Sequence, residues 1–257
     1  MTVSEERESF DAVAAEYHAV RPAYPDALFA DLAGAVGGAG ARVLEVGCGS
    51  GQATRSLLDR GWDVVAVDPG AELIALAQAS LAGRVAFHVA PFEAFAPEPA
   101  SFRLVASAQA WHWIDPVIGF AKAAAALQQG GSLAVFGHVP LPPPPEVAER
   151  LAPIYAELAP ELWGGAPPEA WYLPAGPVRA LFDASGLFGP VVHKAYPWSE
   201  QTSARALVRQ LGTRSYYNAL AADRRDRLLA EVETALTPLG EFSLGHETHL
   251  YRAVVRA

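Results

Sequence analysis

The stretch 43–54, Val-Leu-Glu-Val-Gly-Cys-Gly-Ser-Gly-Gln-Ala-Thr, constrains the fold of this chain more than any other part of it. An apolar run that contains the acidic Glu45 is followed by glycines at 47, 49 and 51, and a helical pattern begins at Gln52. Glycines let the backbone approach a ligand closely, and the first free N–H groups of a helix attract anions. The stretch therefore predicts a strand, a ligand-binding loop and a helix in direct succession.

Short apolar runs alternate with amphipathic segments over the first half of the chain. Strands are expected over 42–46, 63–68, 84–89, 102–107 and 132–137, and helices over 5–18, 25–37, 52–59, 71–81 and 116–128. This alternation is typical of a parallel sheet that is covered on both faces. After residue 138 the pattern predicts a helix over 174–185, strands over 191–198 and 242–255, and two or three helices that end by Leu236.

Composition excludes several classes of function. The formal net charge is −9 and no block of Lys or Arg occurs, which argues against a nucleic-acid partner. The single cysteine, Cys48, rules out an internal disulfide, and the seven histidines show no metal-ligand spacing, so no metal site is expected. The acidic N-terminus is unlike a signal peptide, and no apolar run reaches the roughly 18 residues of a membrane span. We expect a cytoplasmic monomer or homodimer that acts on a small molecule away from membranes.

Asp68 ends the second predicted strand, 17 residues after Gly51. A carboxylate at this place can accept both ribose hydroxyls of a nucleoside, and it can also cap the helix that follows. A nicotinamide dinucleotide fingerprint needs a small residue where this chain has Gln52. The glycine loop and Asp68 together therefore favour a nucleoside site of another kind over that of a nicotinamide oxidoreductase.

Three further tracts extend the pattern across the chain. They are Phe10-x6-Tyr17-x3-Arg21-Pro-x-Tyr-Pro, Ala-Gln-Ala-Trp-His-Trp at 108–113, and Thr-Arg-Ser-Tyr-Tyr at 213–217. With the glycine loop, Glu45 and Asp68, they make the chain resemble the class I S-adenosylmethionine-dependent methyltransferases, in particular the trans-aconitate methyltransferase-like small-molecule group. The resemblance implies methyl transfer from S-adenosylmethionine to a small organic acceptor by direct displacement, with O- or C-methylation expected.

The resemblance also implies the fold and its division. It implies an α/β, Rossmann-like, doubly wound fold with seven mostly parallel strands and an antiparallel last strand. A single domain, 1–257, would comprise cap helices (1–38), a cofactor-binding core (39–138), an inserted lid (139–185) and a C-terminal part that completes the sheet (186–257). The insertion is rich in proline and tryptophan, so it is interpreted either as a lid over the substrate or as a surface excursion.

The resemblance implies a set of cofactor-binding residues around the glycine loop and the ends of the next strands. They are Tyr17, Arg21, Glu45, Gly47, Cys48, Gly49, Gly51, Gln52, Asp68, Pro69, Pro91, Phe92, Glu93, Gln109 and Ala110. Glu45 would reach the amino group of the cofactor through a charge-assisted hydrogen bond. Proline at 91 stands where many relatives carry an aspartate, so the adenine contact passes to Phe92, which has an ordinary core position as its alternative.

His112 is the candidate catalytic residue, because it is titratable near neutral pH and follows the fourth predicted strand. Its alternative is a hydrogen-bonded structural role, since methyl transfer often needs only in-line positioning and exclusion of water. Likewise, Tyr17 and Arg21 either cap the cofactor or form a solvated helix end. Two functional alternatives stay open: a protein of the same fold that binds S-adenosylmethionine without methylating, and a protein methyltransferase.

Overall fold

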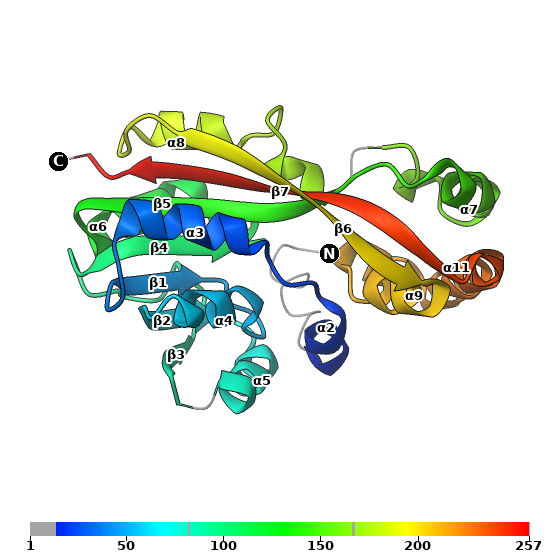
Figure 1. The fold of residues 1–257 in the computed structure, drawn as a ribbon, viewed down its shortest axis with the longest axis horizontal. Helices are drawn as coiled ribbons and strands as arrows, with labels where there is room; N and C mark the ends of the chain where they lie inside the picture. The colour runs from blue at the N-terminus through cyan, green and yellow to red at the C-terminus, as the bar shows by residue number, and fades with distance from the viewer. Residues whose placement is uncertain (1–13, 82, 166–167, 257) are drawn as a thin grey trace.

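A sheet with the strand order β3-β2-β1-β4-β5-β7-β6 runs through the molecule (Figure 1). The computed structural model describes residues 14–81, 83–165 and 168–256, and within them the sheet has seven strands. Their bounds are β1 Arg42–Val46, β2 Asp63–Asp68, β3 Val85–Val89, β4 Phe102–Ala108, β5 Leu127–Pro140, β6 Val192–Ser203 and β7 Glu241–Val254. Neighbours among β1 to β5 are parallel, and β7 is antiparallel to β5 and β6. The predicted fold, with its antiparallel last strand, is confirmed.

Helices cover both faces of this sheet, because successive strand residues point to opposite faces. In β1, Val43 packs in the same cluster as the helices α3, α4 and α5, whereas Leu44 and Val46 pack in the cluster of α6 and α8. No helix among the described residues is long and apolar enough to cross a membrane. The helices of the two faces are α3 Asp26–Val36, α4 Gln52–Asp59, α5 Ala71–Leu81, α6 Pro116–Ala126 and α8 Val178–Ser185.

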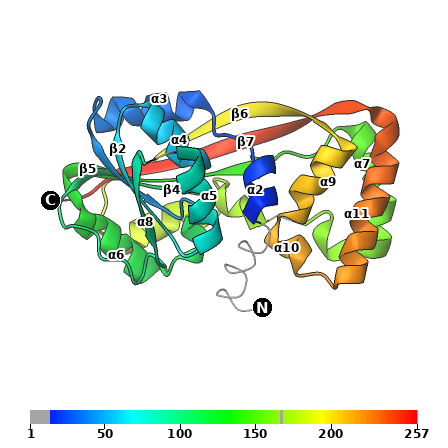
Figure 2. The same cartoon turned by 90° about the horizontal axis from the view of Figure 1, so that it is seen from below.

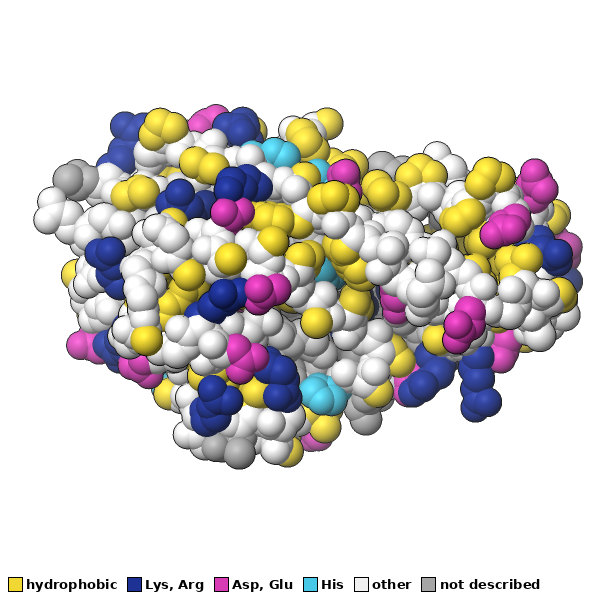
Figure 3. All heavy atoms as spheres, viewed as in Figure 1, with side chains coloured by type: hydrophobic (Ala, Val, Ile, Leu, Met, Phe, Trp, Pro, Cys, Tyr) yellow, Lys and Arg dark blue, Asp and Glu magenta, His cyan; other side chains and the backbone are white. Residues whose placement is uncertain are grey.

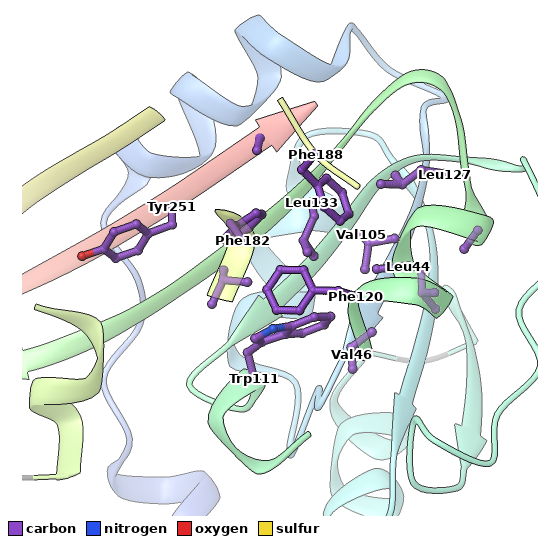
Figure 4. Close-up of a cluster of buried hydrophobic side chains, with 14 of the residues drawn as sticks. Leu44, Val46, Val105, Trp111, Phe120, Leu127, Leu133, Phe182, Phe188 and Tyr251 are labelled. Carbon is purple, nitrogen blue, oxygen red and sulfur yellow. The ribbon is translucent and has the colours of Figure 1, made fainter. Parts of the chain in front are cut away.

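Aromatic rings form the centre of the core on the α6 side. The Phe120 ring meets Trp111, Phe182 and Phe188 edge-on, with centroid distances of 5.4, 5.0 and 5.9 Å (Figure 4). Trp111 belongs to the short helix η2 (Trp111–Trp113), which directly follows the strand β4 and its connecting loop. The packing of Trp111 against Phe120 therefore anchors the tract 108–113 to the hydrophobic core.

A second group of helices lies beyond the sheet, where β6 and β7 continue as a twisted two-stranded ribbon (Figure 2). The helices α9, α10 and α11 are inserted between these two strands, and α7 joins them from the segment after β5. We call this group the helical lobe. Its members are α7 Pro145–Leu158, α9 Ala204–Gly212, α10 Ser215–Asn218 and α11 Ala222–Leu236, with the short helices η3 Pro160–Leu162 and η5 Thr237–Leu239 beside them.

The segment 139–185 occupies three different places. The helix α7 packs in the helical lobe, the short helix η4 (Pro168–Tyr172) lies against β5, and α8 packs on the sheet through Val178 and Phe182. A Cβ atom at Gly137 of β5 would lie 2.6 Å from the ring of Tyr172, so this glycine permits the close approach of η4. Within the segment expected as a lid, η4 is the part that reaches the carboxyl edge of the sheet, and the boundaries 139 and 185 stay a prediction.

Several element bounds differ from those expected. The strand expected over 132–137 runs from Leu127 to Pro140, because pairing with β4 and β7 extends it beyond its apolar centre. The helix expected over 174–185 begins at Val178, after Pro177. The helix expected over 5–18 falls mostly outside the described residues, and the described part is α2, Ala14–Val20. This helix contacts both α5 and α9, and Glu16 pairs with Arg209 at 2.5 Å, so α2 bridges the sheet and the helical lobe.

Replacing Phe120 by alanine should lower the free energy of unfolding by about 3–5 kcal/mol, because the substitution leaves a cavity among three aromatic rings. Val117 on the same helix has 80% of its surface exposed, and Val117→Ala should change stability by less than about 0.5 kcal/mol. Urea unfolding followed by circular dichroism measures both. Equal losses in the two variants would contradict the assignment of the core.

Candidate functional site

The glycine loop is held at the carboxyl edge of the sheet by its neighbours on both sides. Gly47 has a φ of +73°, and a Cβ atom there would lie 2.2 Å from Cβ of Ala110 in the loop after β4. The N–H of Gly47 donates to the carbonyl of Val67 in β2 at 2.8 Å. Only glycine combines this backbone conformation with this close approach. The two loops after β1 and β4 are therefore in direct contact.

Asp68 connects the glycine loop to the next turn. Its Oδ2 accepts a hydrogen bond from the N–H of Gly49 at 2.9 Å, and its Oδ1 accepts one from the N–H of Gly70 at 2.8 Å. The side chain is buried at the end of β2. These two bonds shape the glycine loop and the turn before α5, and the capping of α5 by Asp68 stays a prediction. The ribose role of this carboxylate remains a prediction.

Glu45 is a buried carboxyl group inside β1, beside the glycine loop. Among the residues that the structure describes, neither of its oxygens has a hydrogen-bond partner of normal geometry. Burial raises the pKa of Glu45 to about 8, the charge of Asp68 adds to this rise, and the nearby Thr54 hydroxyl opposes it. A buried carboxylate without a partner is costly, and a bound cation would relieve that cost. The site therefore fits a ligand with a positively charged group at this point.

Gln109 directly follows β4 and has a positive φ, which is rare for a residue other than glycine. Its φ is +55°, and its N–H donates to the carbonyl of Phe136 at 2.8 Å. The chain then turns away from β5, and the side-chain Oε1 accepts from the N–H of His138 at 2.8 Å. The amide oxygen thus takes the place of the backbone carbonyl that a continued strand would offer. Such a strained residue, held by its surroundings, is typical of functional sites.

Three adjoining cavities meet at Gln109, which lines all of them. The first cavity lies along the glycine loop and reaches the helical lobe. The second lies between the ends of β2, β3 and β4. The third lies between the tract 108–113, η4 and α10. Together they form one continuous site at the carboxyl edge of the sheet, which is where open α/β sheets bind their ligands.

The second cavity gathers the residues predicted to hold a nucleoside. Its lining includes Asp68, Pro69, Pro91, Phe92, Glu93 and Ala110. Phe92 is also buried and lies 6.1 Å from Trp111, ring centre to ring centre, so it contributes to the core as well. Lys122 of α6 donates to the carbonyls of Phe92 and Glu93 at 3.2 and 2.6 Å. No motif in the sequence points to Lys122, because it lies about 30 residues after the two residues that it contacts.

The first cavity combines the glycine loop with charged groups from distant segments. From the predicted set it is lined by Arg21, Glu45, Gly47, Cys48, Gly49 and Gln52. Arg21 donates to the carbonyl of Thr213 at 3.2 Å and so connects the N-terminal segment to the helical lobe. Four residues that the sequence pattern did not assign to the site complete this wall, namely His138, Glu169, Arg214 and His246.

The third cavity contains the candidate catalytic residue. His112 hydrogen-bonds through Nδ1 to the hydroxyl of Tyr172 at 3.1 Å, which ties η2 to η4. Across the cavity, Arg214 and Glu169 form a largely buried ion pair at 2.7 Å. Gly51 lines none of the three cavities, because it faces α5 at the start of α4. Tyr17 lies in α2, and its side chain falls outside the described residues.

The raised pKa of Glu45 predicts a pH-dependent stability. Between about pH 4.5 and 8 the Glu45 carboxyl group of the ligand-free folded protein keeps a proton that it loses in the unfolded chain, so its contribution to stability should fall as pH rises through this window. Buried histidines with lowered pKa values, such as His138 and His246, oppose this trend below about pH 6.5, so the contribution of Glu45 is the difference between wild type and Glu45→Gln. In urea unfolding between pH 5 and 8, that difference should approach about 1.4 kcal/mol per pH unit, the value for one proton. Glu72→Gln, at an exposed position of α5, should keep the pH dependence of the wild type. Identical slopes in both variants would refute the assignment.

Comparisons with known proteins agree with this arrangement. Residues 43–131, from β1 into β5, match the family described as a methyltransferase domain. An uncharacterized methyltransferase of Mycobacterium tuberculosis is 30% identical over 228 residues, which cover 89% of this chain and 85% of the relative. The structure of a candidate type II methyltransferase from Anaeromyxobacter dehalogenans is 28% identical, with a TM-score of 0.67, and the match covers 91% of this chain and 97% of that one.

A more distant structure shares the fold. It is the phosphoethanolamine N-methyltransferase 2 of Haemonchus contortus in complex with S-adenosylmethionine, 18% identical with a TM-score of 0.53, and the match covers 95% of this chain and 57% of that chain. The trans-aconitate subgroup stays a prediction. The similarity over nearly the full length, the glycine loop with Glu45 and Asp68, and the strand order show that this chain belongs to the class I S-adenosylmethionine-dependent methyltransferases.

Proposed function

We propose that this methyltransferase transfers the methyl group of S-adenosylmethionine to a small organic acceptor by direct displacement, with O- or C-methylation in cytoplasmic small-molecule metabolism. The observation that carries the cofactor placement is the buried Glu45 carboxyl group, which lacks a partner among the described residues. An α-amino group would supply the charge and the N–H donors that this carboxylate needs. Glycines 47 and 49 leave room for the backbone to approach the same ligand.

The remaining cofactor contacts follow from the cavities. Asp68, which ends β2 and lines the second cavity, would accept the ribose hydroxyls. Phe92 and Ala110 would flank the adenine in the second cavity. Arg21 would reach the carboxylate from the N-terminal segment, since it lines the first cavity beside Glu45. Each contact uses a residue in or directly after β1, β2, β3, β4 or the helix α2.

When bound, the cofactor supplies an electrophilic methyl group on a sulfonium, whose sulfur keeps the bonding electron pair on transfer. The protein would act by positioning and by excluding water. Gln109, at the meeting point of the cavities, is held rigidly by two hydrogen bonds to β5. Tyr172 and Trp113 close the third cavity around His112, which supports a small acceptor rather than a protein chain. His112 remains a candidate base.

The surface supports a small-molecule acceptor rather than nucleic acid. On the face shown in Figure 3, basic and acidic side chains are intermixed over both halves of the molecule. The chain carries 28 acidic residues against 19 basic ones. Nucleic-acid binding draws its affinity from clustered cations, which this distribution does not favour.

Thermal unfolding with added ligands tests the cofactor. S-adenosylmethionine and S-adenosylhomocysteine at about 100 times their dissociation constants should each stabilise the protein by about 2.7 kcal/mol, because they bind the folded state. NADH at the same concentration serves as the control and should have no effect. Stabilisation by NADH alone would overturn the proposal.

Asp68→Ala should weaken binding of S-adenosylhomocysteine at least tenfold, because it removes acceptors for two ribose hydroxyls and a contact of the glycine loop. Asp63→Ala, at the exposed start of the same strand, should leave the affinity unchanged. Isothermal titration calorimetry measures both variants. Unchanged affinity in a folded Asp68→Ala protein would refute the ribose role.

A further inference from the structure

His246 occupies a place in the first cavity that no prediction assigned. It lies in β7, opposite Pro140 of β5 and Trp198 of β6. The imidazole stacks on the Trp198 ring at 4.3 Å between centroids, with an angle of 15° between planes, and its side chain is only 8% exposed. The neighbouring strands and this stacking therefore fix the ring in one orientation at the edge of the sheet where ligands bind.

The two nitrogens of His246 face different surroundings. Nε2 is buried and lies 3.7 Å from Oε2 of Glu200. Oε1 of the same carboxylate accepts from the side-chain amide of Gln210 at 2.6 Å, which fixes Glu200 in turn. Nδ1 is not among the enclosed, unpartnered atoms of the described residues, and His246 lines the cavity that contains Glu45 and the glycine loop. Because Nε2 is enclosed beside Glu200, Nδ1 is the nitrogen left to face this cavity.

The charges around His246 favour a neutral imidazole that can accept a proton. Burial lowers the pKa of His246 to about 4, the charge of Arg214 adds to this, and Glu169 opposes it. The carboxylate of Glu200 would stabilise a proton on the His246 ring. His246 and Glu200 therefore form an ion pair only after His246 has accepted a proton. The titratable and charged groups of the elements packed around the ring are Glu200, His138, Glu169, Arg214, Arg21 and Glu45.

We propose that His246, in place of the candidate His112, is the base that takes the proton released when an acceptor hydroxyl is methylated, with Glu200 as its positioning residue. The proposal rests on the proposed function. A lone pair of the hydroxyl oxygen forms the new C–O bond, the methyl–sulfur bond breaks with its electron pair staying on sulfur, and the hydroxyl proton passes to Nδ1 of His246. A neutral imidazole can act as a general base, and the Glu200 carboxylate, 3.7 Å from Nε2, would stabilise the imidazolium that forms.

This assignment specifies the acceptor class. A carboxylate acceptor is already ionised near neutral pH and needs no base. A protonated amine would meet Arg214, whereas the acidic group of that wall, Glu169, is already paired with Arg214 at 2.7 Å. A neutral phenol or alcohol suits this part of the cavity, because its lining combines the uncharged imidazole of His246 with the ion pair of Glu169 and Arg214, whose charges offset each other. The structure therefore favours a hydroxyl compound as the acceptor.

A chemical test needs no acceptor and no variant. Diethyl pyrocarbonate acylates neutral, accessible imidazole nitrogens, and peptide mass spectrometry locates the modified residues. The matched control is His249, also in β7 and beside a glutamate at 3.1 Å, but with Nδ1 bonded to His193. His246 should be modified at least tenfold faster than His249, with a rate that stays constant down to about pH 5. Equal or slower modification of His246 would overturn the proposal.

The catalytic test uses S-adenosylmethionine with a tritiated methyl group and three sets of probes. These are hydroxyl compounds (phenol, catechol, 4-nitrophenol), carboxylates (benzoate, cinnamate) and an amine (ethanolamine). Label should enter the hydroxyl set. With the best probe, His246→Gln should lower kcat at least 100-fold and leave the affinity for S-adenosylhomocysteine unchanged. Glu200→Gln should lower kcat about tenfold and shift the acidic limb of the pH profile, whereas His249→Gln should stay within threefold of wild type.

The outcomes separate this inference from the proposed function. If the wild-type protein does not bind S-adenosylhomocysteine, the proposed function itself is refuted. Intact binding combined with label only in carboxylates or amine, or with no labelled product from any probe, would overturn the hydroxyl assignment. Full kcat in His246→Gln, or an unshifted pH profile in Glu200→Gln, would overturn the roles of these two residues.

Discussion

The contact between Gly47 and Ala110 is the constraint on which the rest of the site depends. With no side chain at 47, the loops after β1 and β4 meet without the 2.2 Å clash that a Cβ atom would cause. This contact places the glycine loop beside Gln109, and Gln109 in turn is bound to β5 through Phe136 and His138. Four strand ends, those of β1, β2, β4 and β5, are thereby held together by one close backbone approach and a few hydrogen bonds.

Asp68 and Glu45, the two acidic residues beside the glycine loop, carry the same carboxyl group in two different environments. The carboxylate of Asp68 is satisfied by two backbone N–H groups and shapes the loop even without a ligand. Glu45 is buried without such bonds among the described residues, and burial raises its pKa to about 8. A protein that stores an unsatisfied carboxyl group gives up stability in the ligand-free state and regains it on binding. Under the proposed function, Glu45 in β1 would contribute affinity for the cationic amino group of the cofactor.

The sequence predicted the elements whose formation is local. The strands 42–46 and 63–68 and the helix 52–59 have the bounds that the apolar pattern indicated. Gly47, Gly49, Asp68 and Gln109 line the adjoining cavities, and their cofactor roles stay predictions. The pattern failed where distant segments decide the geometry. His138 and His246 share a cavity wall only through the register of β5 with β7, and Glu169 meets Arg214 only because η4 and the start of α10 face each other. Neither contact leaves a periodic signal in the chain.

The helices α9, α10 and α11 are inserted between β6 and β7. Under the proposed function, this insertion separates the residues that bind the methyl donor from those that face the acceptor. The residues proposed to hold the methyl donor lie mostly within the continuous stretch from β1 to the tract after β4, whereas Glu200, Arg214 and His246 come from the ribbon and the helices that it carries. Under the proposed function, substitutions in the helical lobe can alter which acceptor is chosen while the donor pocket keeps its shape. The ribbon thus makes acceptor choice a separately evolvable property of this enzyme.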